Sequence, residues 1–237
     1  MKLKLLALAV TSLISVNALA VSIDYRHEWR DTAKGDQRDR LLISNRFANG
    51  FGLSSEVSWK QSSADSTPNK PFNEQVSNET EVIASYLYKF NQTFSLESGF
   101  SLVSGSTYNT YRPYLRGGVK FADDWTATLR YRPYYKRISG NIGSSSNTAE
   151  NGYNITANVG YTFLKDYNIS YEYDFKKINH AGAKSYDNHS YNADHQVKLS
   201  YKWDKNWKPY ISLSNLADNG TSDHRQTRYR VGVVYTF

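Results

Sequence analysis

Residues 111–136 carry the clearest structural signal of the chain and read Tyr-Arg-Pro-Tyr-Leu-Arg-Gly-Gly-Val-Lys-Phe-Ala-Asp-Asp-Trp-Thr-Ala-Thr-Leu-Arg-Tyr-Arg-Pro-Tyr-Tyr-Lys. Phe121 and Trp125 enclose Ala-Asp-Asp, and aspartate at such positions favours a tight turn. On both sides of this turn, apolar and aromatic residues alternate with polar ones. A period of two is typical of strands with one apolar face. The stretch therefore predicts two antiparallel strands joined by a hairpin.

Two aromatic residues separated by three others occur in this way five times. The copies are Phe47-Ala-Asn-Gly-Phe51, Phe90-Asn-Gln-Thr-Phe94, Phe121-Ala-Asp-Asp-Trp125, Phe163-Leu-Lys-Asp-Tyr167 and Trp203-Asp-Lys-Asn-Trp207. Longer polar connections, such as Gln61–Gln75, Ser139–Asn151 and Ala217–His224, lie between the hairpins. Five short turns and six longer loops predict twelve antiparallel strands, with both chain ends on the short-turn side.

The composition excludes several classes of protein. The 237 residues include 20 Tyr, 10 Phe and 5 Trp but no Cys, and the mean hydropathy is −0.65. So many aromatic residues argue against a disordered chain, and the lack of Cys excludes a disulfide scaffold. The low hydropathy argues against a helical membrane protein, but it is compatible with a membrane barrel, whose strands alternate polar and apolar residues.

Two all-β architectures fit the alternation, a soluble β-sandwich and a membrane barrel. A sandwich buries its apolar face, whereas a barrel in lipid turns that face outward and places aromatic residues at both interfaces. Aromatic residues do mark the strand ends, and the chain finishes in Tyr235-Thr-Phe237, which resembles the terminal signal of outer-membrane proteins. We therefore predict an all-β, 12-stranded antiparallel transmembrane β-barrel of the bacterial outer membrane.

The first twenty residues have the pattern of a secretory signal peptide. Lys2 and Lys4 precede an uncharged, mostly apolar run, and Ala18-Leu-Ala20 provides a small-residue cleavage site. A transmembrane anchor is the alternative, but the run is short for one. Removal of residues 1–20 would lower the formal charge from +7 to +5, because it removes two lysines and no acids. Residues 21–237 would then form a single barrel domain.

If the apolar side chains face lipid, the alternate side chains face the lumen. The lumen-facing basic residues are then Arg26, Arg40, Arg46, Lys60, Lys89, Arg112, Arg116, Lys120, Arg130, Arg132, Lys136, Lys176, Lys198, Lys202, Lys208, Arg228 and Arg230. The acidic ones are Asp24, Glu28, Glu56, Glu81, Glu97, Glu172, Asp174 and Asp194. This bias of 17 to 8 predicts a basic pore.

The arginines gather on two opposite walls of the predicted barrel. The sixth and seventh strands carry Arg112, Arg116, Arg130, Arg132 and Lys136, and the twelfth, first and second carry Arg228, Arg230, Arg26, Arg40 and Arg46. These ten residues are the candidate substrate-binding lining of the pore. The six that lie five to seven residues from the short turns are candidates for a constriction: Arg116, Arg130, Arg132, Arg26, Arg40 and Arg230.

Two roles are open to these arginines. In a narrow pore they would select anions. A guanidinium can bind both oxygens of a carboxylate, and a polyanion can exchange its contact with one arginine for a contact with the next. Alternatively, they pair with lumen acids and only stabilise the interior. Pairing suits Arg26, which lies near Asp24 and Glu28, but it suits the sixth and seventh strands poorly, since their acids, Asp123 and Asp124, lie in the turn.

Several stretches resemble the oligogalacturonate-specific porin family, which also contains a sialic-acid porin. They are Val21-Ser-Ile-Asp-Tyr-Arg-His-Glu28, Arg46-Phe-Ala-Asn-Gly-Phe-Gly-Leu-Ser-Ser-Glu-Val57, Tyr111-Arg-Pro-Tyr-Leu-Arg-Gly117, Leu129-Arg-Tyr-Arg-Pro-Tyr134, Leu199-Ser-Tyr-Lys-Trp-Asp-Lys-Asn-Trp-Lys-Pro-Tyr210 and Arg225-Gln-Thr-Arg-Tyr-Arg-Val-Gly-Val233. The resemblance implies a monomeric channel that passes acidic oligosaccharides from pectin by diffusion. It maps the family's arginine tracks onto Arg112, Arg116, Arg130, Arg132, Arg228 and Arg230, with Arg26, Arg40 and Arg46 on the opposite track.

Other functions fit the residues less well. Another acidic sugar, such as sialic acid or a sulfated oligosaccharide, is the alternative substrate. A lipid-acting barrel enzyme is the alternative of another class, but no motif marks a nucleophilic serine. His180, Asp187, His189, Asp194 and His195 match no zinc spacing, and basic residues that face a lumen do not bind nucleic acid. We expect no cofactor, no metal and no enzymatic activity, with acidic oligosaccharide and outer-membrane lipid as the partners.

Overall fold

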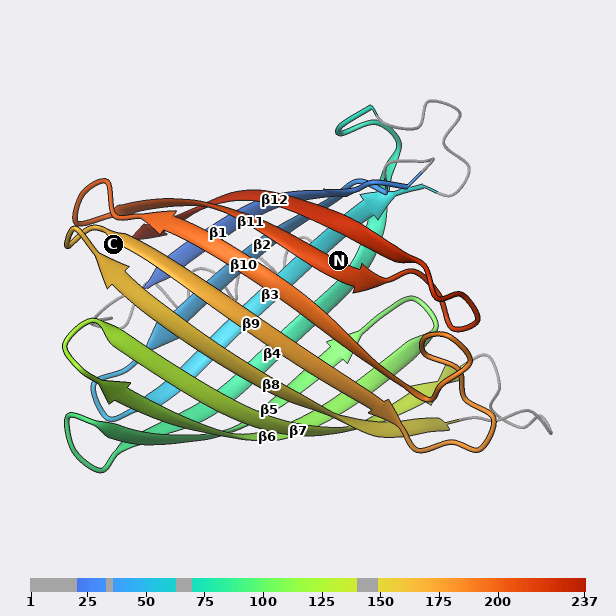
Figure 1. Cartoon of the computed structure of the whole chain (residues 1–237), viewed down its shortest axis with the longest axis horizontal. Helices are drawn as coiled ribbons and strands as arrows, with labels where there is room; N and C mark the ends of the chain where they lie inside the picture. Colours follow the sequence, from blue (N-terminus) through green and yellow to red (C-terminus); the bar gives the residue numbers. More distant parts are fainter. Residues whose placement is uncertain (1–20, 33–35, 63–69, 140–148) are drawn as a thin grey trace, which may run out of the picture.

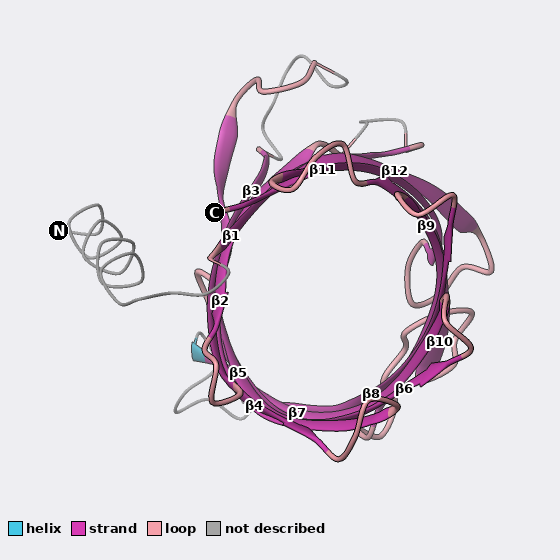
Figure 2. Ribbon diagram, turned by 90° about the vertical axis from the view of Figure 1, so that its left-hand side faces the viewer, coloured by secondary structure: helices cyan, strands magenta, loops and turns pink. Residues whose placement is uncertain are grey.

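The computed structural model describes residues 21–32, 36–62, 70–139 and 149–237, so the predicted signal peptide lies outside the described residues. Twelve antiparallel strands form a closed barrel (Figures 1 and 2). They are β1 (Ser22–Arg30), β2 (Arg38–Arg46), β3 (Phe51–Gln61), β4 (Gln75–Lys89), β5 (Phe94–Ser104), β6 (Tyr108–Phe121), β7 (Trp125–Ile138), β8 (Ala149–Phe163), β9 (Tyr167–Ile178), β10 (Tyr191–Tyr201), β11 (Trp207–Ala217) and β12 (Arg225–Thr236). The predicted fold class is confirmed.

The barrel closes where the last strand pairs with the first. Each strand pairs with its neighbour in sequence, and β12 pairs with β1 from Thr236 opposite Ser22 to Arg228 opposite Arg30. The amide of Phe237 extends this seam by donating to the carbonyl of Val21, at 3.0 Å. Closure leaves no unpaired edge, which a sheet in lipid requires. Among the described residues, the structure contains no helix long and apolar enough to cross a membrane.

The two ends of the barrel differ in their connections. All five aromatic-flanked turns lie at one end, on the left of Figure 1, together with the C-terminus. The other end carries six connections, but the prediction that all six are long was wrong. Residues 105–107 join β5 to β6 in three residues, because the amide of Gly105 donates to the carbonyl of Tyr108 and closes a tight turn. In addition, β8 already begins at Ala149, within the predicted loop.

The turn between β10 and β11 shows how side chains fix the short connections. Oδ1 of Asp204 accepts hydrogen bonds from the amides of Asn206 and Trp207, both at 2.7 Å. The amides of Trp207 and Asn206 lower the pKa of Asp204, since they stabilise its ionised form. An aspartate that binds the backbone in this way holds the chain in the turn.

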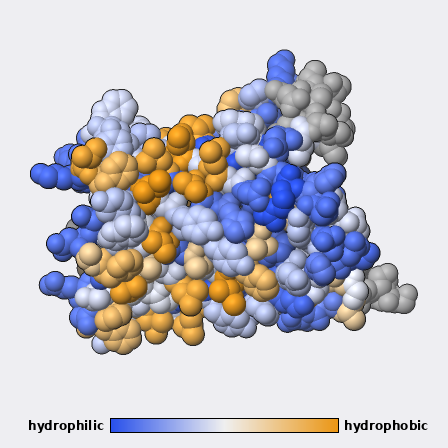
Figure 3. Space-filling model, in the orientation of Figure 1, coloured by the Kyte–Doolittle hydropathy of each residue, from blue (hydrophilic) through white to orange (hydrophobic). Residues whose placement is uncertain are grey.

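Aromatic rings form two lines across the outer face. At the short-turn end, stacked rings run from β6 to β10, with centroids 4.6 to 6.1 Å apart, through Phe121, Trp125, Tyr161, Phe163, Tyr167 and Tyr201. Towards the longer loops, a second line passes through Tyr131, Tyr153, Phe175 and Tyr191. Aliphatic side chains such as Leu129 and Ile211 are also exposed. Figure 3 shows hydrophobic side chains gathered on the outer face of the barrel. The two lines match the interface girdles of a membrane barrel.

Three tyrosines on the inner face lie over glycines of the neighbouring strand. The pairs are Tyr114 over Gly99, Tyr134 over Gly152 and Tyr210 over Gly232. A Cβ at Gly232 would come within 2.5 Å of the Tyr210 ring. Because the glycines leave this space, each tyrosine lies flat and donates its hydroxyl to a lumen acid: Glu97 at 2.7 Å, Glu150 at 2.9 Å and Asp24 at 2.8 Å, respectively.

Gly232→Ala should therefore lower the stability of the barrel. The added methyl group would displace the Tyr210 ring and weaken its hydrogen bond to Asp24. Overpacking of this kind costs about 1–3 kcal/mol. Thermal unfolding, followed by the loss of strand signal in circular dichroism, would measure the effect. The control is Gly117→Ala, because no atom lies within 4 Å of a Cβ at Gly117. Equal midpoints for both variants would contradict the account.

Candidate pore lining

All ten predicted arginines and lysines lie on the inner face of the barrel. On each strand they occupy the same alternate positions as the residues whose side chains contact one another across the interior. For example, Arg46 of β2 contacts Glu97 of β5 at 3.2 Å. In the ring, β6 lies six positions from β12, so the two basic walls are opposite each other. Arg30 and Arg38 also lie on the inner face and were missed by the sequence analysis, whereas Lys202 lies in the turn after β10 rather than in a strand.

The wall formed by β12, β1 and β2 is extensively paired, and we call Arg26, Arg40, Arg228 and Arg230 the braced wall. Arg40 contacts the carboxylates of Asp24 and Glu56, and Nε of Arg230 donates to Glu28 at 2.8 Å. Arg26 lies 3.6 Å from the same Glu28. Arg228 donates to Ser214 and Gln196, at 3.1 and 3.5 Å. These guanidinium groups already have protein acceptors.

Glu97 binds two further arginines. It lies almost fully buried between Arg46, at 3.2 Å, and Arg116, and it also accepts the hydroxyl of Tyr114. The sequence favours an unpaired Arg116, since the acids of β6 and β7 nearest to it lie in the turn, but its acid Glu97 comes from the adjacent β5. Arg116 is therefore a paired residue on an otherwise unpaired wall.

The opposite wall carries basic side chains that form no ion pair with an acid in the described part of the chain, and we call Arg112, Arg130, Arg132, Lys136 and Lys176 the open wall. Arg112 and Arg132 have no hydrogen bond or ion pair to any residue that the structure describes, and Nε of Arg132 is buried. Arg130 donates to the hydroxyl of Thr156, at 3.0 Å. Lys136 and Lys176 lie over the rings of Tyr108 and Tyr134, at 4.2 and 5.5 Å.

Four of these five cations line a cavity of about 290 Å³ in the half of the barrel nearer the longer loops. Its two acids, Glu79 and Glu150, accept hydroxyls from Tyr108 and Tyr134 instead of pairing with arginine. The cavity thus offers cationic donors to which no described carboxylate is bound. The sequence predicts that Lys176 faces the lumen. It is not among the predicted site residues, since it is isolated on β9 and belongs to no cluster of arginines.

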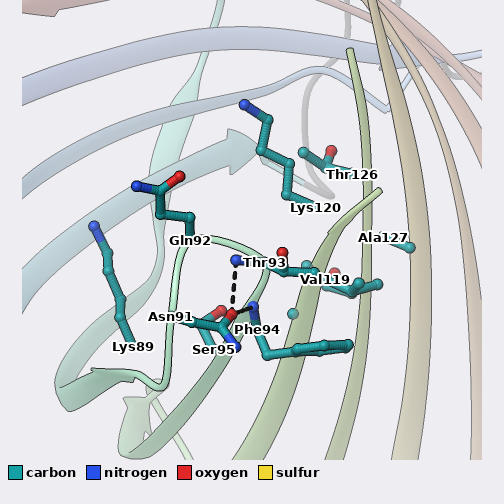
Figure 4. Close-up of a pocket in the computed structure, with 12 residues that line it drawn as sticks. Lys89, Asn91, Gln92, Thr93, Phe94, Ser95, Val119, Lys120, Thr126 and Ala127 are labelled. Atoms are coloured by element: carbon teal, nitrogen blue, oxygen red, sulfur yellow. Dashed lines mark hydrogen bonds between the residues drawn. The ribbon is translucent and has the colours of Figure 1, made fainter. Parts of the chain in front are cut away.

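A second hollow, of about 700 Å³, lies at the short-turn end (Figure 4). It is lined by Lys89 and Gln92, and by Lys120 and Thr126 of β6 and β7. Oδ1 of Asn91 fixes the adjoining turn by accepting the amides of Thr93 and Phe94, at 2.8 and 2.7 Å. Its two lysines place positive charge at the mouth of the lumen, away from the open wall.

Among the described residues, no group of three or more histidine and acidic side chains is arranged to hold a metal ion. Asp194, from the histidine-rich part of the chain, instead accepts the amide of Ala217 at 3.1 Å. His195 contacts the hydroxyl of Tyr171 on the outer face, at 2.7 Å.

Comparison with known proteins identifies the family. The family model described as oligogalacturonate-specific porin protein (KdgM) matches residues 14–237. The chain belongs to this family. It is 66% identical to the oligogalacturonate-specific porin KdgM of Dickeya dadantii over 237 residues, which cover the whole of both chains. It is also similar to a solved structure titled KdgM porin in complex with disordered oligogalacturonate, with 52% identity and a TM-score of 0.68 over 92% of this chain and 99% of that one.

A solved NanC porin has the same fold, with 18% identity and a TM-score of 0.73 over 91% of this chain and all of that one. The chain is thus an outer-membrane porin, as the sequence predicted, and membership of this channel family confirms that it is not an enzyme.

Replacement of Glu97 should show how strongly one acid organises two arginines. Glu97→Gln would leave Arg46 and Arg116 without a carboxylate and should lower the free energy of unfolding by about 1–3 kcal/mol. Urea unfolding in detergent micelles would measure this. Glu172→Gln is the matched control, because it removes the same charge from an inner-face position without an ion pair to a described residue. Equal stability of the two variants would contradict the assignment.

Proposed function

We propose that this porin is an anion-selective channel for the passive diffusion of acidic oligosaccharides, namely oligogalacturonates from pectin, and that the open wall binds their carboxylates. The observation that carries the proposal is the difference between the walls: the arginines of the braced wall have protein acceptors, whereas Arg112 and Arg132 have none among the residues that the structure describes. An entering carboxylate can bind Arg112 and Arg132 without displacing any described protein group.

The energetics favour such a wall. Two unit charges 4 Å apart interact with about 4 kcal/mol at an effective dielectric constant near 20, and salt screens them over about 8 Å. Arginine suits this task because its planar guanidinium binds both oxygens of a carboxylate. Arg130 and Arg132 alternate along β7, and Arg112 lies on the adjacent β6. A polyanion can therefore exchange one contact for the next, which permits both entry and release.

The braced wall contributes in another way. Its arginines hold Asp24, Glu28 and Glu56 in fixed positions and keep those carboxylates from facing the lumen unpaired. An uncompensated acid there would repel an anionic substrate. We also propose that the porin works as a monomer, since the closed barrel encloses the whole lumen within one chain.

Arg112→Gln together with Arg132→Gln should weaken both anion selectivity and substrate binding. Reversal potentials across a planar bilayer in a salt gradient would give the permeability ratio, and block of the open-channel current would report oligogalacturonate binding. Loss of a charged hydrogen-bonding partner costs about 1.5–3 kcal/mol, so the half-blocking concentration should rise at least tenfold.

The matched control is Lys89→Gln together with Lys120→Gln, which removes the same charge at the short-turn mouth. We expect a small decrease in selectivity and little change in block. Equal effects of the two double variants would contradict the role of the open wall. Cation selectivity, or a current that oligogalacturonate leaves unaltered in the unchanged porin, would contradict the proposed function itself.

A further inference from the structure

The charges on the outer face of the described strands are unevenly distributed. Three side chains of Arg or Lys point outward, Arg137, Lys177 and Arg225, and all lie at strand ends beside the longer loops. Asp39 is the one outward acid on these strands. It is buried, and its carboxylate already forms hydrogen bonds with the hydroxyl of Tyr25 at 2.7 Å, with His27 at 3.0 Å and with Gln75.

Lys177 is held in place by neutral groups. Its Nζ donates to the hydroxyl of Ser190 at 2.6 Å and lies 5.6 Å from the centre of the Tyr191 ring. In the sheet, Lys177 lies directly opposite Tyr191, and this ring stacks on Phe175, 5.9 Å away, in the second aromatic line. The ammonium group is therefore fixed at the level of the membrane interface, and two of its three donors make no hydrogen bond to a described residue.

Arg225 of β12 contacts β10, the strand that carries Tyr191, from the other side. Its Nε donates to Oδ1 of Asn215 at 2.6 Å, and its Nη2 donates to the carbonyls of Ala193 and Asn215, at 2.8 and 3.0 Å. The guanidinium also lies over the ring of Tyr186, at 5.2 Å. All of these partners are uncharged, and Nη1 donates to no described residue. Both cations thus flank β10, held in position by neutral groups and without an ion pair to any described acid.

We propose that Lys177 and Arg225 form a binding site for the phosphate groups of the phosphorylated glycolipid in the outer leaflet of the membrane, with Arg137 as the next cation along the rim. The longer loops of such barrels are extracellular, which places these residues at the outer interface. In Figure 3 the side chains towards that end are hydrophilic, beside the apolar band. Basic residues at a membrane interface bind anionic headgroups. The acid nearest to Arg225 in the sequence is Asp223; its carboxylate is exposed and lies 3.8 Å from Nε2 of His224.

Lys177→Gln together with Arg225→Gln tests the site in the full barrel, purified in detergent and titrated with diphosphorylated lipid A. Native mass spectrometry would count bound lipid, and we expect affinity to fall about thirtyfold relative to the unchanged porin. Lys165→Gln together with Lys205→Gln removes the same charge from the short turns at the opposite end and should leave binding unchanged. If the double variant does not fold, Lys177→Gln alone tests the site. It keeps the hydrogen bonds of Arg225 and should still weaken lipid binding severalfold.

Dephosphorylated lipid A separates headgroup recognition from binding of the acyl chains. Its affinity should be low and should not respond to the Lys177 and Arg225 substitutions. Equal binding of both lipids, equal binding by both double variants, or full competition by millimolar inorganic phosphate would overturn a lipid site. Because ion permeation does not enter this assay, its outcome is independent of the proposed transport function.

Discussion

A backbone that crosses lipid must form its hydrogen bonds within the protein, and the rest of this structure depends on that constraint. The pairing of β12 with β1 satisfies it by removing the last two free edges. Once the sheet is closed, alternation along each strand separates an apolar outer face from a polar inner one. The aromatic lines, the lumen charges and the interface cations all follow from this separation.

Inside the barrel, the important distinction is between cations that have an acceptor and cations that do not. Arg40 and Arg230 contact carboxylates of β1 and β3, whereas Arg112 and Arg132 face a cavity whose acids are bound to tyrosines. The glycines opposite Tyr114, Tyr134 and Tyr210 contribute to this arrangement, because they allow the rings to lie flat over the sheet. In the function that we propose, anion selectivity thus depends on which cations the acids pair with, and not only on the total charge of the pore.

Much of the fold could be predicted from the sequence, since the period of two and the five aromatic-flanked turns are local signals. The three-residue connection at Gly105 was missed because it lacks the aromatic pair that marks the other short turns. The inward orientation of the ten candidate side chains also followed from the alternation of polar and apolar residues. Their pairing did not, because Arg116 finds Glu97 on the neighbouring strand and Lys176 joins the open wall only through the register of β8 and β9.

We infer that the unpaired arginines of the lumen bind the substrate and that the paired ones do not. The dwell time of single oligogalacturonate molecules in the channel tests it most directly, with Arg132→Gln compared with Arg26→Gln. Both variants remove one guanidinium from the lumen, but Glu28 keeps Arg230 at 2.8 Å when Arg26 is replaced. We expect a dwell time at least several-fold shorter for Arg132→Gln and an unchanged one for Arg26→Gln. Equal shortening in both variants would mean that pairing does not decide which arginines bind the substrate.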